Sequence, residues 1–570
     1  MLDCLSSRRS LERILTFVSL ALGVLHAWFG RYSMNPDGIS YLDVGDSFFR
    51  HDWANAMNAW WSPLYPWTVG LVLGMAKPSP KWEFPLVHLF NFGVFVAALF
   101  AFRFLLHALL VFDRERSSDT LPNANDRQAL PEWAIVLVAY PTFWWIALEV
   151  DTLYGVSPDL AVVACACLTA GMLLRLRQGD ALWKFALFGL ILGIGYWTKT
   201  ILFPLGFVAL GAGYLWKRSS PCWARGMAVA GVVFLCASAP LIFLLSHQKG
   251  RFTFGDSGKV NYAWYVSPRT FWRNWQGEVP GSGIPVHPTR QLLRHPPLFE
   301  FDGPVAGTYP PWTDPSYWNE GLHWHFKLKP QMQVLAGTVP SAARLLLRAR
   351  PELVAGVIAL ALLGGPLWLT GWRELWPFLA MSVAGIGIYL PLVENDRYLG
   401  GSALVLFLTV IAAVRLRPEV QKSGSYVAIA VFLVMALGTA DYTVRVALNH
   451  MAIPGTGPDS AWRDVVAAGQ LRRMGAQPGD KIAIIADGTG AFWARLGKLR
   501  IVAEIMDANH GSKEFWDAPE EVRQQAYEAF ARSHAKLVVT VCPPWPPGTL
   551  TDWERIAQTP YCVRSLQPSQ

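Results

Sequence analysis

The stretch that decides the fold is Leu11–Val44, LERILTFVSLALGVLHAWFGRYSMNPDGISYLDV. Its first part, 11–29, is apolar and long enough to cross the hydrocarbon core of a bilayer, which takes about 20 residues. We expect an uncleaved helix here, because Arg8 and Arg9 precede the run but no small-residue cleavage site follows it. Directly after it, a Pro-Asp-Gly turn carries Asp37 among aromatic residues. The stretch therefore predicts a membrane helix that ends at a polar site.

The rest of the chain has the same apolar character. Of its 570 residues 52% are hydrophobic and 16% are charged, with a mean hydropathy of +0.27, which excludes an ordinary soluble enzyme. We predict a polytopic α-helical membrane protein with about eleven transmembrane helices. The apolar runs lie at 11–29, 85–108, 133–148, 158–174, 183–198, 201–216, 226–245, 352–370, 375–392, 398–414 and 425–443.

The distribution of basic residues predicts the orientation. The formal net charge is +8, but Lys and Arg lie in short clusters between the apolar runs, which favours a topology signal over nucleic-acid binding. With a cytoplasmic N-terminus, most of these clusters fall inside. Loops 30–84 and 246–350 and everything after about residue 445 then lie outside. We expect 30–84 to form helices in the outer interface and 246–350 to cover a site.

The C-terminal part has a different character. We predict a membrane domain over 1–445 and a small extracytoplasmic α/β domain over 455–570, because the latter alternates amphipathic helices with buried strands such as DKIAIIAD and AKLVVTVC. Its DGTGAFWARLG segment lacks the spacing of a nucleotide-binding loop and is interpreted as a turn. Cys542 and Cys562 are its two cysteines and the one plausible disulfide.

Charged side chains lie at the outer ends of several spans. Such charges are costly near a membrane and usually functional. A carboxylate there can take the proton of an acceptor hydroxyl that attacks a sugar, while Lys and Arg stabilise a phosphate leaving group. We therefore predict glycosyl transfer from a polyprenyl-phosphate sugar to an extracytoplasmic acceptor hydroxyl. The predicted residues are Asp37 as catalytic base, Lys199 and Arg397 for the donor phosphate, and Glu149, Asp159, Glu394, Tyr41 and Tyr398 for substrate binding.

These motifs resemble the GT-C membrane glycosyltransferases, of the protein O-mannosyltransferase and lipid A aminoarabinose transferase type (glycosyltransferase family 39-like). PDGISYLDVGD with WWSPLYPWTVGL resembles their first outer loop, which has an acidic residue followed by interfacial helices. GIGYWTKTILFPLG is similar to their helix–turn–helix with an outward lysine, and ENDRYLGG to their late Glu/Arg-Tyr turn. The resemblance covers 11–443 and implies a GT-C fold, a lipid-linked donor and a bacterial inner-membrane location.

Other interpretations of these residues stay open. Asp37 is also a turn former, Asp159 a helix cap, Lys199 a membrane-surface anchor, and Arg397 a partner for the acids in its own turn. A transporter or lipid-linked sugar flippase is the alternative function, although it predicts related halves and charges near mid-membrane. We expect no cofactor, but His323 and His325 leave a divalent metal open. The acceptor is a protein, a glycolipid or a polysaccharide.

Overall fold

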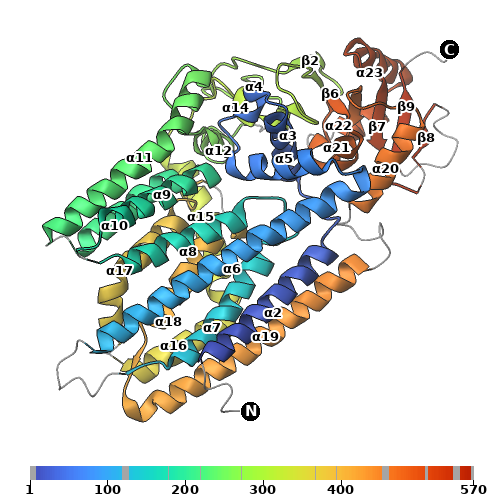
Figure 1. Ribbon diagram of the computed structural model, residues 1–570. Coiled ribbons are helices and arrows are strands. Elements are labelled where there is room, and N and C mark those ends of the chain that lie inside the picture. Colours follow the sequence, from blue (N-terminus) through green and yellow to red (C-terminus); the bar gives the residue numbers. More distant parts are fainter. Residues whose placement is uncertain are drawn as a thin grey trace.

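The computed structural model describes residues 8–118, 128–177, 179–217, 220–270, 273–365, 368–392, 395–451, 461–507, 511–543, 552–556 and 558–566 (Figure 1). A bundle of long helices forms one part, and the C-terminal domain lies at one end of it (Figure 1). The bundle helices are α2 (Arg8–Phe29), α6 (Pro80–Ser118), α7 (Glu132–Trp144) continued by η1 (Trp145–Val150), α8 (Asp159–Arg175), α9 (Leu182–Thr198), α10 (Leu202–Trp216), α11 (Pro221–Lys249), α16 (Pro351–Gly364), α17 (Trp368–Gly387), α18 (Asp396–Ala412) and α19 (Gln421–Met451).

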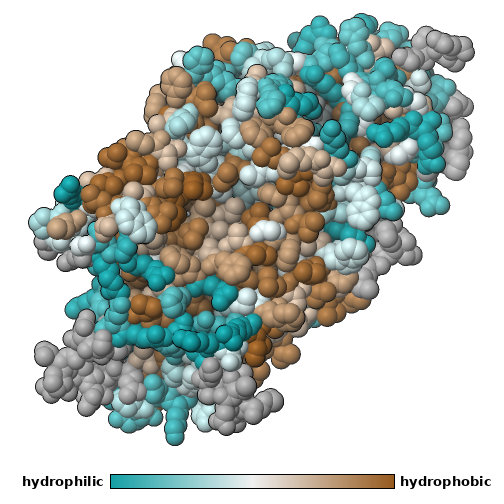
Figure 2. Space-filling model, in the orientation of Figure 1, coloured by the Kyte–Doolittle hydropathy of each residue, from teal (hydrophilic) through white to brown (hydrophobic). Residues whose placement is uncertain are grey.

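Most predicted apolar runs coincide with one of these helices, whereas run 352–370 covers α16 and the start of α17, and run 375–392 extends past the end of α17. Among the described residues five segments are long and apolar enough to cross a membrane, namely α2, α6, α7 with η1, α11 and α19. The number of spans therefore stays a prediction. Figure 2 shows a broad hydrophobic zone over the bundle, with hydrophilic side chains gathered at its two ends. This distribution is typical of a protein that spans a membrane.

A layer of shorter helices lies between the bundle and the C-terminal domain. Segment 30–84 supplies α3 (Pro36–Phe49), α4 (Trp53–Ala56) and α5 (Leu64–Ala76), and loop 246–350 supplies α12 (Ser257–Tyr265), α13 (Pro310–Thr313), α14 (Pro315–Trp318) and α15 (Leu328–Arg348). Helices α3 and α5 touch through Gly45 and Gly70, because a Cβ on Gly70 would lie 2.3 Å from the Gly45 carbonyl oxygen. This contact fixes α3, which carries Asp37.

The C-terminal domain is built on a mixed sheet. In the described part of the chain the sheet has seven strands in the order β2-β3-β6-β5-β7-β9-β8. Strands β6, β5 and β7 are parallel, and the outer strands are antiparallel. Their bounds are β2 (Arg290–Leu293), β3 (Leu298–Glu300), β5 (Lys481–Ile485), β6 (Arg500–Ile505), β7 (Leu537–Val541), β8 (Glu554–Arg555) and β9 (Tyr561–Ser565).

The remaining elements complete this domain and the far end of the bundle. Helices α20 (Trp462–Arg473), α21 (Phe492–Gly497), α22 (Gly511–Asp517) and α23 (Glu520–Arg532), with the 3-10 turn η4 (Gly488–Gly490), belong to the C-terminal domain. Strand β1 (Gln128–Ala129) pairs with β4 (Arg415–Leu416), which the 3-10 turn η3 (Pro418–Val420) follows. Of the segment DGTGAFWARLG, which was predicted to be a turn, Gly488–Gly490 form the 3-10 turn η4, but Phe492–Gly497 form helix α21. Cys542 is bonded to Cys562.

The sheet draws two of its strands from another part of the sequence. Strands β2 and β3 come from loop 246–350, and β3 pairs with β6 of the C-terminal domain. The sheet thus extends beyond 455–570 into the segment that the sequence assigned to the membrane domain. As a result, the long loop and the C-terminal domain form one structural layer above α3.

A buried arginine links this layer to α3 and α6. Arg495 of α21 is 1% exposed, and its Nη1 lies 2.7 Å from both Asp43 Oδ1 and Asp46 Oδ2, while its Nε lies 2.8 Å from Glu83 Oε1. The backbone N–H of Thr308 also donates to Asp43. Removing one partner from buried ion pairs of this kind costs about 3–5 kcal/mol, so these contacts hold the C-terminal domain firmly against α3.

The orientation predicted from the basic clusters leads to a direct test. Reporter fusions at Gln421, the first residue of α19, and at Gly479, just before β5, should lie on opposite sides of the membrane, because α19 is long and apolar enough to span it. The measurement uses reporter enzymes that are active on just one side of the membrane. A fusion at Arg177 should report the same side as the fusion at Gln421. Fusions at Gln421 and Gly479 on the same side would contradict the predicted topology.

Candidate active site

Four charged residues from four helix ends meet in one ion-pair cluster. Lys199 Nζ lies 2.6 Å from Asp159 Oδ1, and Arg397 Nη2 lies 2.6 Å from Asp37 Oδ2. Arg397 Nε also lies 3.6 Å from Asp159 Oδ2, so that Arg397 joins the two pairs. The fold thus brings together the predicted base, both predicted phosphate ligands and one predicted substrate ligand. We call Asp37, Asp159, Lys199 and Arg397 the ion-pair cluster.

Helix ends place each of these side chains. Pro36 begins α3, which puts Asp37 in the first turn, where the helix dipole favours a carboxylate. Asp159 begins α8, Lys199 follows α9 in an extended conformation, and Arg397 lies in the first turn of α18. Arg397 therefore binds acids from two other helices, and its role extends beyond its own turn.

Tyrosine rings surround the two cations. The Lys199 ammonium lies 4.1 Å from the centre of the Tyr398 ring, and the Arg397 guanidinium lies 5.2 Å from it. Tyr398 in turn stacks on Tyr389 with ring centres 5.0 Å apart. Tyr41, one turn after Asp37 on α3, is buried, and this burial and the nearby Asp37 carboxylate raise its pKa well above the ordinary value. Both predicted tyrosines thus belong to the same site, and Tyr41 stays protonated.

The ion-pair cluster forms part of the wall of a large cavity. This main cavity has a volume of about 900 Å³ and is lined by all four members of the cluster and by residues 252–259 of the long loop. The loop therefore covers the site, as predicted from the sequence. A further cavity of about 580 Å³, the side cavity, shares Asn35, Asp159 and Arg397 with it. The cluster consequently separates two spaces that are each large enough for part of a substrate.

An apolar crevice leads from the main cavity into the bundle. It lies between α8, α9, α10, α17 and α18 and is lined mostly by aliphatic side chains such as Val162, Ile191 and Leu205. Tyr389 and Tyr398 line both the crevice and the main cavity. The charged groups therefore lie next to an apolar crevice, which is the arrangement that an amphiphile with an anionic head requires.

Comparison with known proteins identifies the fold. No protein-family model matches the chain, and no curated protein matches it in sequence. Among solved structures it is similar to ArnT from Cupriavidus metallidurans bound to undecaprenyl phosphate, with 12% identity and a TM-score of 0.53 over 98% of each chain. The apo state of that ArnT has 12% identity and a TM-score of 0.52, covering 97% of this chain and 99% of the other. ArnT, the lipid A aminoarabinose transferase, is a GT-C glycosyltransferase. This chain has the GT-C fold.

The GT-C fold confirms the predicted fold class, and within it one predicted site residue, Glu149, lies away from the main cavity. Glu149 in η1 pairs with Arg350, between α15 and α16, and does not line the main cavity. Glu394 lies outside the described residues. The role of Glu149 in substrate binding stays a prediction that the geometry does not support, because Glu149 does not line the main cavity.

Lys259 is a cavity residue that the sequence did not single out. It lies on α12 of loop 246–350, which we call the covering loop, and it lines the main cavity. It has no ion-pair partner among the described residues. Partial burial, followed by the neighbouring Arg251, lowers its pKa. Its sequence signal is one lysine in a short polar helix, which is too common to predict a site. Carboxylates pair directly with Lys199 and Arg397, whereas Lys259 forms no ion pair with a described residue, although Asp256 and Glu320 lie near it.

Asp151 adds a carboxyl group behind the cluster. It lies in the turn between η1 and α8 and is buried, and neither carboxyl oxygen has a hydrogen-bond partner among the described residues. Burial and the nearby Asp159 raise its pKa well above the ordinary value. Asp151 thus has a weaker tendency to ionise than a carboxyl group in water, and it forms no ion pair at contact distance with Lys199 or Arg397.

The described residues provide no separate metal centre. Within the ranges that the structure describes, no three His, Cys, Asp or Glu side chains converge in the way that metal ligands do. His325 instead shares a hydrogen bond with the carbonyl oxygen of Gly281. A dependence on divalent metal therefore stays a question for experiment, with or without bound substrate.

Proposed function

We propose that this chain is an integral-membrane glycosyltransferase that moves a sugar from a polyprenyl-phosphate donor to a hydroxyl group of an extracytoplasmic acceptor. The observation that carries the proposal is the ion-pair cluster on the wall of a cavity that shares Tyr389 and Tyr398 with an adjacent apolar crevice. The GT-C fold supports it, since a solved structure of similar fold contains undecaprenyl phosphate. We place the protein in a bacterial inner membrane with this site on the outer side.

The cluster provides both ends of the reaction. Lys199 and Arg397 stabilise the negative charge that develops on the phosphate as the bond between it and the sugar breaks. Asp37 takes the proton of the acceptor hydroxyl, whose oxygen forms the new bond to the sugar. Asp37 Oδ2 binds Arg397, while Oδ1 has no hydrogen-bond partner among the described residues and is available to the hydroxyl. The products are the glycosylated acceptor and polyprenyl phosphate.

The apolar crevice accounts for the lipid. A crevice lined by aliphatic side chains is as apolar as the bilayer core, so a polyprenyl chain can enter it without exposure to water. Tyr389 and Tyr398, which line both spaces, mark the point where the chain would join the phosphate. The donor head therefore lies beside Lys199, whose ammonium faces the Tyr398 ring.

The proposal is tested with purified protein in proteoliposomes. Undecaprenyl-phosphate sugars are supplied together with protein, glycolipid and polysaccharide fractions of the cell envelope, and the release of undecaprenyl phosphate is measured with the Asp37→Asn variant as the blank. Sugar transfer to one fraction supports the proposal and names the acceptor class. Movement of the lipid-linked sugar across the bilayer without transfer would instead establish the flippase alternative.

Lys259→Met should raise the KM for the donor about tenfold, because a hydrogen bond to a charged group contributes about 1.5 kcal/mol or more. Its ammonium lines the main cavity without an ion-pair partner in the described chain. Donor kinetics provide the measurement. Lys327→Met, an exposed lysine of the same loop, is the matched control and should leave the KM unchanged. Equal KM values in wild type and Lys259→Met would show that Lys259 does not meet the donor.

A further inference from the structure

A group of tryptophans forms one side of the main cavity. Trp60, Trp61, Trp264 and Trp312 all line it, and we call them the aromatic wall. Their rings are in mutual contact, with centres 4.9 Å apart for Trp60 and Trp264, 6.0 Å for Trp61 and Trp312, and 6.2 Å for the stacked pair Trp264 and Trp312. The wall thus joins segment 30–84 to the covering loop across the site.

Hydrogen bonds fix the orientation of this wall. Asn58 Oδ1 accepts from the backbone N–H groups of Trp60, at 3.1 Å, and Trp61, at 2.7 Å. The Trp61 indole N–H donates to the Trp312 carbonyl oxygen at 3.2 Å. The Trp264 indole N–H donates to Asn319 Oδ1 at 3.1 Å. The rings are therefore held in place before any ligand arrives, which reduces the entropy lost on binding.

The aromatic wall begins beside the ion-pair cluster. Tyr41, one helical turn from Asp37, packs against Trp61 with ring centres 4.8 Å apart. On the other side, Ser62 Oγ lies 3.1 Å from the Oγ1 of Thr200, the residue after Lys199. A sugar is bonded directly to its phosphate, so the sugar of a donor held by Lys199 must lie within a few ångström of that cation. The wall lines the same cavity as Lys199, and Tyr41 and Ser62 connect it to the cluster.

Burial separates Trp60 from the other members of the wall. Trp61, Trp264 and Trp312 are buried, whereas Trp60 is partly exposed. Trp60 therefore has side-chain surface left for a ligand in the cavity that it lines. The face of an indole ring carries the negative side of the ring quadrupole. The C–H groups on one face of a pyranose are apolar and weakly positive, and they complement such a surface.

We propose that the aromatic wall is the sugar subsite, where the apolar face of the donor's pyranose ring stacks on Trp60. This inference rests on the proposed function, because it takes the ligand to be a lipid-linked sugar. Trp61, Trp264 and Trp312 support the Trp60 ring, and the cluster holds the phosphate. The wall then selects sugars by the face that they present and leaves recognition of the lipid phosphate to the cations.

The test compares two lipids in the full-length protein in nanodiscs. The first ligand is undecaprenyl phosphate without a sugar. The second is a sugar-carrying undecaprenyl phosphate, taken in turn from a panel of pentose and hexose derivatives. Wild type should bind at least one panel member more tightly than undecaprenyl phosphate. Trp60→Leu should lower the affinity for that panel member about tenfold, which is the upper end for an aromatic contact. The affinity for undecaprenyl phosphate should stay unchanged. Trp60→Tyr should retain most of the sugar-dependent affinity.

Controls separate the possible failures. Trp53→Leu, which changes an exposed tryptophan of α4 that does not line the main cavity, should bind both lipids like wild type. If Trp60→Leu loses affinity equally for both lipids, or loses affinity for neither, the sugar subsite is overturned while the proposed function stands. The absence of a sugar-dependent difference in wild type also overturns it. Wild type that binds neither lipid overturns the proposed function itself, and the subsite with it.

Discussion

Asp37→Asn is expected to lose transfer activity by roughly 100-fold to 10,000-fold, the usual contribution of general base catalysis, while the protein folds and inserts normally. Asparagine keeps the size of the side chain and an oxygen that accepts the Arg397 hydrogen bond, which measures 2.6 Å from Asp37 Oδ2. What it loses is the ability to take a proton. The loss should therefore appear in kcat, with donor binding largely retained.

The measurement is steady-state kinetics with the donor identified in the screen above. Asp396→Asn is the matched control, because Asp396 is an exposed carboxylate next to Arg397 and does not line the main cavity. It should retain near wild-type turnover. If Asp37→Asn also retained it, the carboxylate would be structural, and Asp159 would become the first base to examine, because it lines the main cavity and Glu149 does not.

Lys199→Met is expected to lower kcat/KM for the donor about 100-fold or more, because the loss of one group that stabilises developing charge costs about 3 kcal/mol. Lys199 is the cation nearest the crevice, facing Tyr398 and paired with Asp159 at 2.6 Å. Its removal also leaves Asp159 with the more distant Arg397 as its ion-pair partner, at 3.6 Å. Lys199→Arg keeps the charge and should recover part of the activity.

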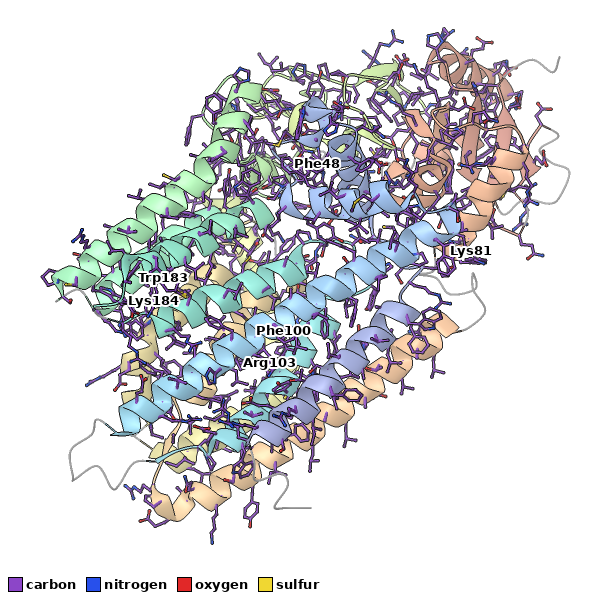
Figure 3. The ribbon with its side chains drawn as sticks, viewed as in Figure 1. Phe48, Lys81, Phe100, Arg103, Trp183 and Lys184 are labelled. Atoms are coloured by element: carbon purple, nitrogen blue, oxygen red, sulfur yellow. A yellow bond between two sulfur atoms is a disulfide. The ribbon has the colours of Figure 1, made fainter. Side chains whose placement is uncertain are left out.

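The control for this variant lies at the other end of the same helix. Lys184 pairs with Asp180 on the surface at the start of α9, away from Phe48 of α3 and the covering loop (Figure 3). Lys184→Met should leave donor kinetics unchanged, because surface ion pairs contribute little. Normal donor kinetics in Lys199→Met would reduce Lys199 to an anchor at the membrane surface.

The sequence predicted the bundle well because membrane helices are encoded locally. A run of apolar residues such as 226–245 has one stable solution in a bilayer, and α11 covers it. Asp37, Lys199 and Arg397 were predicted together for a related reason, since residues at the outer ends of spans share one surface. Their individual partners were not predictable, because they depend on which helices are neighbours.

Features that depend on distant pairing were missed. Strands β2 and β3 have four and three residues, too short for a periodic signal, and they become strands by pairing with each other and with β6. Arg495 is a single arginine in a short helix, and its three carboxylates come from α3 and α6. Lys259 gains its meaning from the cavity that it lines. Tertiary contacts alone distinguish these residues from ordinary ones.

The shared sheet has a consequence for the order in which the protein matures on the ribosome. Strand β3 is synthesised early, yet Glu300 pairs with Ala503 and Leu298 with Ile505, more than 200 residues later in the chain. A nascent chain that has reached the end of α19 already contains Asp37, Asp159, Lys199 and Arg397. At that point β6 has not been synthesised, so the edge of β3 that pairs with it is still unpaired. The covering loop is therefore completed last, and a growing chain should acquire transfer activity only when its C-terminal domain has emerged and folded.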